Sequence, residues 1–212
     1  MTLLWEQIFL FYDIIATCPV SRKNKYELGI RQVICMRYHT HVMTSLAASA
    51  CIASYTPLPF SIGYVSGVII GSIIPDIDEP NSYLGRRSFG MSSKVKQAFG
   101  HRGMTHSLLV WAVITAVLLV QSPSMFSYGF IIGYILHIIE DFFSVQGVPL
   151  FWPFQTKRYK SFITYRTAGF LEKFIYYISF AICVFYVVQF HLFSEFSTSV
   201  LELVNNILTD IL

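Results

Sequence analysis

The chain has 212 residues, a length that suits one ordinary domain, and its formal net charge of +3 is too small to indicate a nucleic-acid partner. Apolar residues make up 54% of the sequence and charged residues only 13%, and the mean hydropathy is +0.56. These values are poor for a soluble globule and favour a protein that lies in a lipid bilayer.

The first apolar run, residues 8–16, does not have the form of a cleavable signal peptide. Glu6 precedes the run, Asp13 interrupts it, and no basic residue stands before it.

Two helical hairpins are predicted next. Residues 42–74 are almost wholly apolar, and two prolines within Thr56–Pro59 break the run because proline cannot continue a helix. The same plan recurs in Ser107–Val120 and Phe126–Phe143, which the residues QSPS separate. Each helix has roughly 15 to 18 residues, at or below the usual spanning length of about 20, and local thinning of the bilayer would absorb the difference.

A fifth apolar run, Phe174–Phe193, is long enough to span a bilayer alone. Apolar residues at helical spacing then predict an amphipathic tail, residues 194–212, that lies on the membrane surface. The predicted fold is therefore all-α, an integral membrane bundle of two helical hairpins plus a fifth helix, with residues 37–193 as the membrane-embedded domain.

The fifteen Lys and Arg residues fall into three clusters of five, within residues 22–37, 86–102 and 157–173. If each hairpin crosses the membrane and returns, all three clusters lie on one side, and the positive-inside rule makes that side cytoplasmic. A soluble all-α domain would show a charged face on each helix, and these runs lack one. We therefore expect a multi-pass membrane protein.

Histidines and carboxylates gather at the helix ends that would face that same side. His137 and Asp141 are four residues apart, so one helix face presents both. His106 can enter the same space from the start of the neighbouring helix, and Asp76 or Asp78 from the end of another. Imidazole with carboxylate suits zinc, manganese or iron, and the four scattered cysteines form no C-x-x-C pair. The sequence predicts a divalent metal site and does not choose between these three ions.

Other polar residues at the same ends have two interpretations. A single histidine there is more often a cap or a hydrogen-bonded core residue than a ligand, and the helix dipole alone favours an acid at Glu172. The set as a whole favours a metal, because ionisable groups at membrane depth are costly. These further residues are His39, His41, His101 and Glu172. His191, in the last apolar run, is interpreted as structural.

Three arginines of the second basic cluster, Arg86, Arg87 and Arg102, also have two interpretations of equal weight. A guanidinium offers a bidentate fork to an anionic group such as a phosphate. The alternative is that these residues only set the topology.

Four ordered motifs resemble the YdjM-like membrane-bound metal-dependent hydrolases over residues 38–173: PDIDEPNSYLGRR, FGHRGMTHSLL, GYILHIIEDFFSVQGVPLFWPF and LEKF. The resemblance implies a bacterial inner-membrane protein. Because it begins near Tyr38, and no candidate ligand precedes that position, we expect residues 1–36 to be an N-terminal extension that the functional core does not need. It also implies a distant similarity to the zinc-dependent phospholipase C and P1 nuclease superfamily of all-α enzymes, which makes zinc the preferred ion over manganese or iron. Carried over by motif, the ligand candidates are His41, Asp76, Asp78, His101, His106, His137 and Asp141. The chain departs from the family at Glu79, where His is usual, and at Ser144, where Thr is favoured.

We predict a hydrolase that acts on an ester or phosphodiester, including that of a phospholipid, through a metal-activated water at the cytoplasmic interface. Asp76, Asp78 or Glu79 would serve as general base where it is not a ligand. Two alternatives stay open: a structural or transport-related metal site without catalysis, and a membrane scaffold. A transporter would place polar groups near the bilayer midplane, whereas helix centres such as residues 108–120 carry no charge.

Overall fold

A computed structural model describes residues 25–78, 82, 84–88, 92–94, 97, 103–166 and 169–211, with the backbone alone at 25–37, 86, 193, 195, 210 and 211. The long helices are α2 (Lys25–Tyr55), α3 (Ile62–Ile73), α5 (Leu108–Gln121), α6 (Met125–Phe142), α7 (Phe170–Gln189) and α8 (Leu192–Ile211). Three short 3₁₀ helices are η1 (Ile74–Asp78), η2 (Gly85–Arg87) and η3 (Met104–His106). The described residues form helices and no β-strand, so the predicted all-α class is confirmed.

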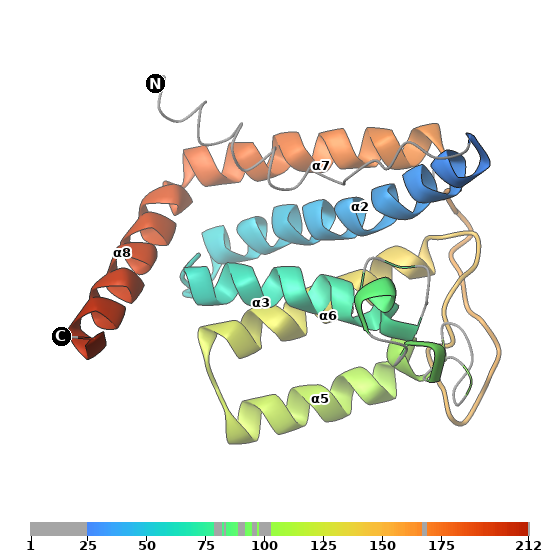
Figure 1. Ribbon diagram of the computed structural model, residues 1–212, viewed down its shortest axis with the longest axis horizontal. Coiled ribbons are helices and arrows are strands. Elements are labelled where there is room, and N and C mark those ends of the chain that lie inside the picture. Colours follow the sequence, from blue (N-terminus) through green and yellow to red (C-terminus); the bar gives the residue numbers. More distant parts are fainter. Residues whose placement is uncertain are drawn as a thin grey trace.

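The five helices from α2 to α7 alternate in direction along the chain (Figure 1). The ends of α3 and α6 and the starts of α5 and α7 therefore lie at one end of the bundle, on the right in Figure 1. Both turns lie where the prolines predict them, since α2 ends at Tyr55 and α5 ends at Gln121. This alternation brings together the helix ends that carry the polar residues.

Helix α2 is longer than the apolar pattern predicts. It begins at Lys25 and continues to Tyr55 without a break, across the expected boundary between residues 36 and 37. Residues 1–24 lie outside the described part of the chain. That residues 1–36 are dispensable stays a prediction.

Serine side chains begin three of the helices, which explains why the apolar runs start where they do. The Ser61 hydroxyl oxygen accepts a hydrogen bond from the backbone N–H of Tyr64, at 3.3 Å, at the start of α3. Ser107 and Ser124 cap α5 and α6 in the same manner. Each cap pairs a backbone donor that has no partner within its helix.

Helices α3 and α6 cross with their backbones in close approach. Each carries a G-x-x-x-G motif, and the four glycines are Gly67, Gly71, Gly129 and Gly133. A methyl group added at Gly71 would lie 2.2 Å from the carbonyl oxygen of Phe130, and one at Gly133 would lie 2.2 Å from that of Val68. Only glycine permits this distance, so the two motifs fix the position of one helix against the other.

Two described helices, α6 and α7, are long and apolar enough to cross a membrane, while α5 is apolar but has only 14 residues. None of the residues of α5 is buried, and in α7 only Glu172 and Ser179 are buried. Exposed apolar surface of this extent is unfavourable in water, at about 25 cal/mol per Å². If lipid hydrocarbon surrounded these helices, that free-energy cost would not arise. The number of membrane crossings stays a prediction.

The last apolar run is divided differently from the predicted Phe174–Phe193. Helix α7 ends at Gln189, and His191 has a positive φ of 54° in the turn before α8. His191 therefore lies in a turn, not in the spanning helix as predicted, because a left-handed residue interrupts the helix there.

Helix α8 occupies most of the predicted tail and projects from the bundle in Figure 1. Leu192 is buried, and the Ser199 hydroxyl oxygen accepts a hydrogen bond from the backbone N–H of Ile62 at 2.9 Å. Further along, Leu201, Val204 and Leu208 are exposed. That this apolar surface lies on a membrane stays a prediction.

The two-hairpin topology predicts which loops a membrane-impermeant thiol reagent reaches in intact cells. In a cysteine-free background, a cysteine at Ser122 should be labelled and a cysteine at Ser93 should not, because Ser93 belongs to a basic cluster assigned to the cytoplasm. Both serines are exposed, so burial does not explain a difference. Labelling of both positions would contradict the topology.

Candidate metal centre

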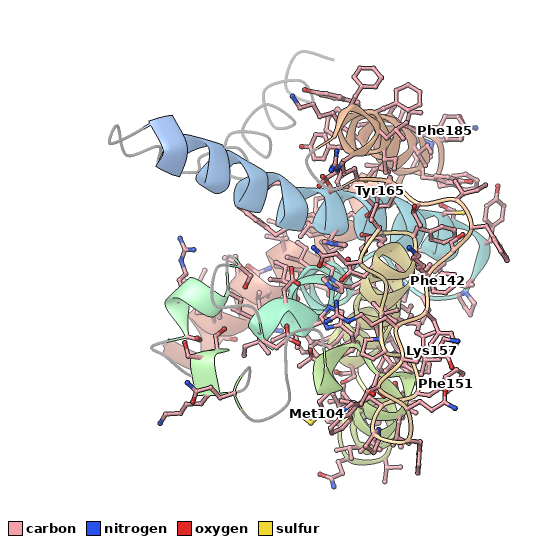
Figure 2. All side chains as sticks on the ribbon, turned by 90° about the vertical axis from the view of Figure 1, so that its right-hand side faces the viewer. Met104, Phe142, Phe151, Lys157, Tyr165 and Phe185 are labelled. Carbon is pink, nitrogen blue, oxygen red and sulfur yellow. The ribbon has the colours of Figure 1, made fainter. Side chains whose placement is uncertain are left out.

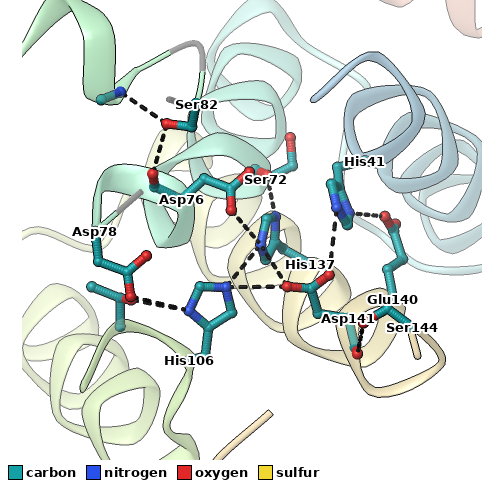
Figure 3. Close-up of polar contacts among 12 residues, drawn as sticks. His41, Ser72, Asp76, Asp78, Ser82, His106, His137, Glu140, Asp141 and Ser144 are labelled. Carbon is teal, nitrogen blue, oxygen red and sulfur yellow. Dashed lines mark hydrogen bonds and ion pairs between the residues drawn. The ribbon is translucent and has the colours of Figure 1, made fainter. Parts of the chain in front are cut away.

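Four predicted residues, Asp76, His106, His137 and Asp141, meet at the end of the bundle (Figure 3). One potential ligand atom from each lies within 4.8 Å of all the others. Asp76 belongs to η1 directly after α3, His106 ends η3 just before α5, and the other two residues share a face of α6. The expected meeting of His106 with His137 and Asp141 is thus observed.

The distances within this group suit a tetrahedral ion. The Nε2 atom of His106 lies 3.3 Å from Nε2 of His137 and 3.2 Å from Oδ2 of Asp141. The Nε2 atom of His137 lies 3.7 Å from Oδ2 of Asp141 and 3.8 Å from Oδ1 of Asp76. Tetrahedral zinc with bonds of about 2.0–2.1 Å has ligand atoms roughly 3.3–3.4 Å apart. Small side-chain movements would bring all four atoms to these positions.

Hydrogen bonds at the far nitrogen of each ring orient the two histidines. Nδ1 of His137 lies 2.7 Å from the carbonyl oxygen of Ser72, an atom that can only accept. Nδ1 of His106 lies 3.0 Å from Oγ1 of Thr105 and 3.7 Å from Oδ2 of Asp78. With the proton on Nδ1 in each ring, both Nε2 lone pairs point at the same space, the arrangement typical of histidine ligands.

Neighbouring side chains hold the loops that carry Asp76 and His106. The Ser82 hydroxyl donates to the backbone carbonyl of Asp76 at 2.8 Å, which fixes the turn of η1. The Tyr134 hydroxyl donates to the carbonyl of Thr105 at 2.7 Å and so ties η3 to α6. The group is therefore supported by residues outside it.

Asp78 lies beside the four-residue group. Its Oδ2 atom accepts hydrogen bonds from Oγ1 of Thr105 at 2.8 Å and from the backbone N–H of Gly103 at 3.3 Å. The same oxygen faces Nδ1 of His106, on the side of the ring away from the four-residue group. Asp78 therefore helps to orient the His106 ring. The structure thus gives Asp78 a supporting position.

His41 also lies beside the group, stacked on His137 with ring centroids 4.2 Å apart. Its Nδ1 atom contacts the Glu140 carboxylate, and its Nε2 atom lies 3.7 Å from Oδ1 of Asp141. The Thr44 hydroxyl donates to the same Glu140 carboxylate. His41 therefore links Asp141 to a second carboxylate that our sequence analysis did not identify.

The remaining predicted residues are separate from the group or are not described. Glu172 is buried and accepts a hydrogen bond from Oγ1 of Thr40 at 3.1 Å, which ties α7 to α2. His39 is half-buried on α2, and its ring lies against Tyr38. Arg87 is exposed in η2. Glu79, His101 and Arg102 lie outside the described residues, as does the side chain of Arg86.

The charges around His106 favour a cation at that ring. Burial by itself lowers the pKa of His106, but its hydrogen bonds and the negative charges of Asp141 and Asp78 outweigh burial and raise that pKa to about 9. Without a metal, this raised pKa favours a second proton on the His106 ring, at Nε2, in addition to the one on Nδ1. A metal ion that binds Nε2 has to displace this proton, so acid and metal compete for the site.

An all-helical bundle with two helices long and apolar enough to cross a membrane, and with a largely buried group of two histidines and two aspartates, defines an all-α protein with a candidate metal centre. The family model described as "YdjM inner membrane protein" matches residues 36–204, and the chain belongs to this family. The family resemblance predicted from the motifs is confirmed. The more distant similarity to phospholipases and nucleases stays a prediction.

Individual relatives agree with this assignment. Inner membrane protein YdjM of Escherichia coli (strain K12) is 35% identical over 117 residues, which cover 52% of this chain and 60% of that protein. The protein of the same name in Shigella flexneri gives the same values. Uncharacterized protein YvsG of Bacillus subtilis (strain 168) is 31% identical over 154 residues, which cover 72% of this chain and 95% of that protein. No solved structure matches the chain.

Proposed function

We propose that the protein is a metal-dependent hydrolase of the bacterial inner membrane, with its centre at the cytoplasmic interface. Asp76, His106, His137 and Asp141 would hold the ion, zinc being preferred to manganese or iron. The observation that most strongly supports a metal at this position is the 3.3 Å separation of the Nε2 atoms of His106 and His137. Once an ion displaces the second proton of His106, the Nε2 lone pairs of both rings face one position between them, at the spacing of two ligands of tetrahedral zinc.

A divalent ion at this position supplies Lewis acidity, by which water is activated near neutral pH and an ester or phosphodiester oxygen is polarised. Asp76 is the most solvent-accessible member, with a side chain 16% exposed against 2% or less for the other three. Water would therefore reach the centre past Asp76. Where Asp76 is not a ligand, this exposure also makes it the best-placed general base among the described residues. Anion binding by Arg86, Arg87 and Arg102 stays part of the proposal.

The deep burial of three members favours a second candidate, a structural metal site without catalysis. His106 and His137 are fully buried and Asp141 is nearly so. Closed, four-ligand zinc sites are typically structural, whereas catalytic sites keep one position open. Asp76 decides between the two: a structural centre needs it as a permanent ligand, and a hydrolase needs that side to open to water.

The test is metal analysis of the full chain purified in detergent, followed by hydrolysis assays. The substrates are a nitrophenyl ester, a nitrophenyl phosphodiester and vesicles of phosphatidylglycerol. We expect stoichiometric metal and hydrolysis of at least one substrate class that is lost on chelation and restored by added zinc. Retained metal without any hydrolysis would favour the structural site, and absence of metal would contradict both.

A further inference from the structure

An apolar pocket of ≈ 360 Å³ lies on the α7 side of the metal centre, between α2, α6, α7 and the segment before α7. This volume is within the range of about 300–1,000 Å³ typical of small-molecule sites. Most of its lining is aliphatic or aromatic. The lining residues are Thr40, Thr44, Ile139, Glu140, Phe143, Ile163, Thr164, Tyr165, Leu171 and Ile175.

The polar residues of the pocket lie one side chain away from the metal centre. Thr44 donates a hydrogen bond to Glu140, and Glu140 contacts Nδ1 of His41. The opposite edge of the His41 ring lies 3.7 Å from Asp141. A molecule in the pocket therefore has an apolar environment along its length and, at Glu140, a position next to the residues of the centre.

The pocket is continuous with an exposed apolar surface. Ile163 is 82% exposed and Leu171 is 55% exposed, and both line the pocket. Along α7 this surface continues over Phe174 and Ile178, on a helix that is long and apolar enough to cross a membrane. Figure 2 looks onto this end of the molecule, where Tyr165 lies between α7 and the end of α6 at Phe142.

We propose that this pocket holds the acyl chain of a membrane lipid, which enters sideways from the bilayer with its ester end toward Glu140 and His41. Two observations favour an acyl chain over a soluble ligand. The lining offers few polar groups, and the opening joins a surface that hydrocarbon would cover. Building on the proposed function, this makes the substrate a lipid ester, which would approach from the membrane while water approaches past Asp76.

The experiment is photo-cross-linking of the full chain reconstituted in phosphatidylethanolamine and phosphatidylglycerol vesicles. A trace of phosphatidylglycerol carries a diazirine on its acyl chain, and mass spectrometry maps the labelled peptides. We expect labelling concentrated in residues 139–143 and 163–175. Ile175→Trp, which fills the pocket, should lower this labelling by about ten-fold. Val188→Trp, near the far end of α7 and outside the lining, should leave it unchanged.

Even labelling along α7, or an equal effect of the two tryptophan variants, would overturn the lipid site. Because labelling needs neither metal nor turnover, it is repeated after chelation and should persist. Persistent pocket labelling in a protein without hydrolytic activity would support the lipid site and contradict the proposed function. Hydrolysis of a soluble ester without pocket labelling would support the proposed function and contradict the lipid site.

Discussion

Replacing His137 by alanine is expected to lower the affinity for a divalent metal by more than about 100-fold, beyond the range typical of residues outside the ligand shell. The change removes an Nε2 atom that lies within 3.8 Å of potential ligand atoms on His106, Asp141 and Asp76. It leaves the apolar helices that drive membrane insertion intact. Competition with a chromophoric chelator measures the affinity in detergent.

Two further variants separate ligands from supporting residues. His41→Ala and Asp78→Asn should each weaken metal binding by about 10- to 100-fold without abolishing it, because these residues orient Asp141 and His106. His191→Asn is the matched histidine control, since asparagine tolerates the positive φ of the turn before α8. Metal loss in His41→Ala together with metal retention in His137→Ala would contradict the four-residue group.

The chemistry of the centre was predictable where it depends on spacing along one helix. His137 and Asp141 are four apart on α6, and helical geometry alone places both on one face. The positions of Asp76 and His106 were predictable to the extent that proline breaks fix the hairpins. Which residues join the four-residue group and which support it was not predictable, because that depends on side-chain directions between helices.

Glu140 illustrates this limit. It stands next to Asp141 in the sequence, and a carboxylate within an apolar helix is itself a signal of a partner. Its partners Thr44 and His41 lie on α2, almost one hundred residues earlier, so no local pattern connects them. The length of α2 was missed for a related reason, since its first turns are polar and carry no apolar periodicity.

The two G-x-x-x-G motifs stand in the sequence as GVIIG and GFIIG. Their pairing explains how α3 and α6 keep the fixed relative position that brings Asp76 and His137 together. Gly71 lies five residues before Asp76, and Gly133 lies four residues before His137. Close contact between α3 and α6 at these glycines sets the distance between the two candidate ligands. Packing and metal binding should therefore fail together.

Gly71→Ala is expected to destabilise the fold by about 3 kcal/mol and to reduce metal content, because its methyl group would lie 2.2 Å from the Phe130 carbonyl oxygen. A backbone atom cannot move away alone, so α3 and α6 would have to separate. Gly63→Ala on the same helix is the control, since its nearest contact would be an ordinary 3.5 Å. It should be neutral or slightly stabilising, as alanine favours helix over glycine. Thermal unfolding and metal analysis of both variants in detergent provide the measurement, and equal behaviour of the two would show that the close crossing does not hold the centre together.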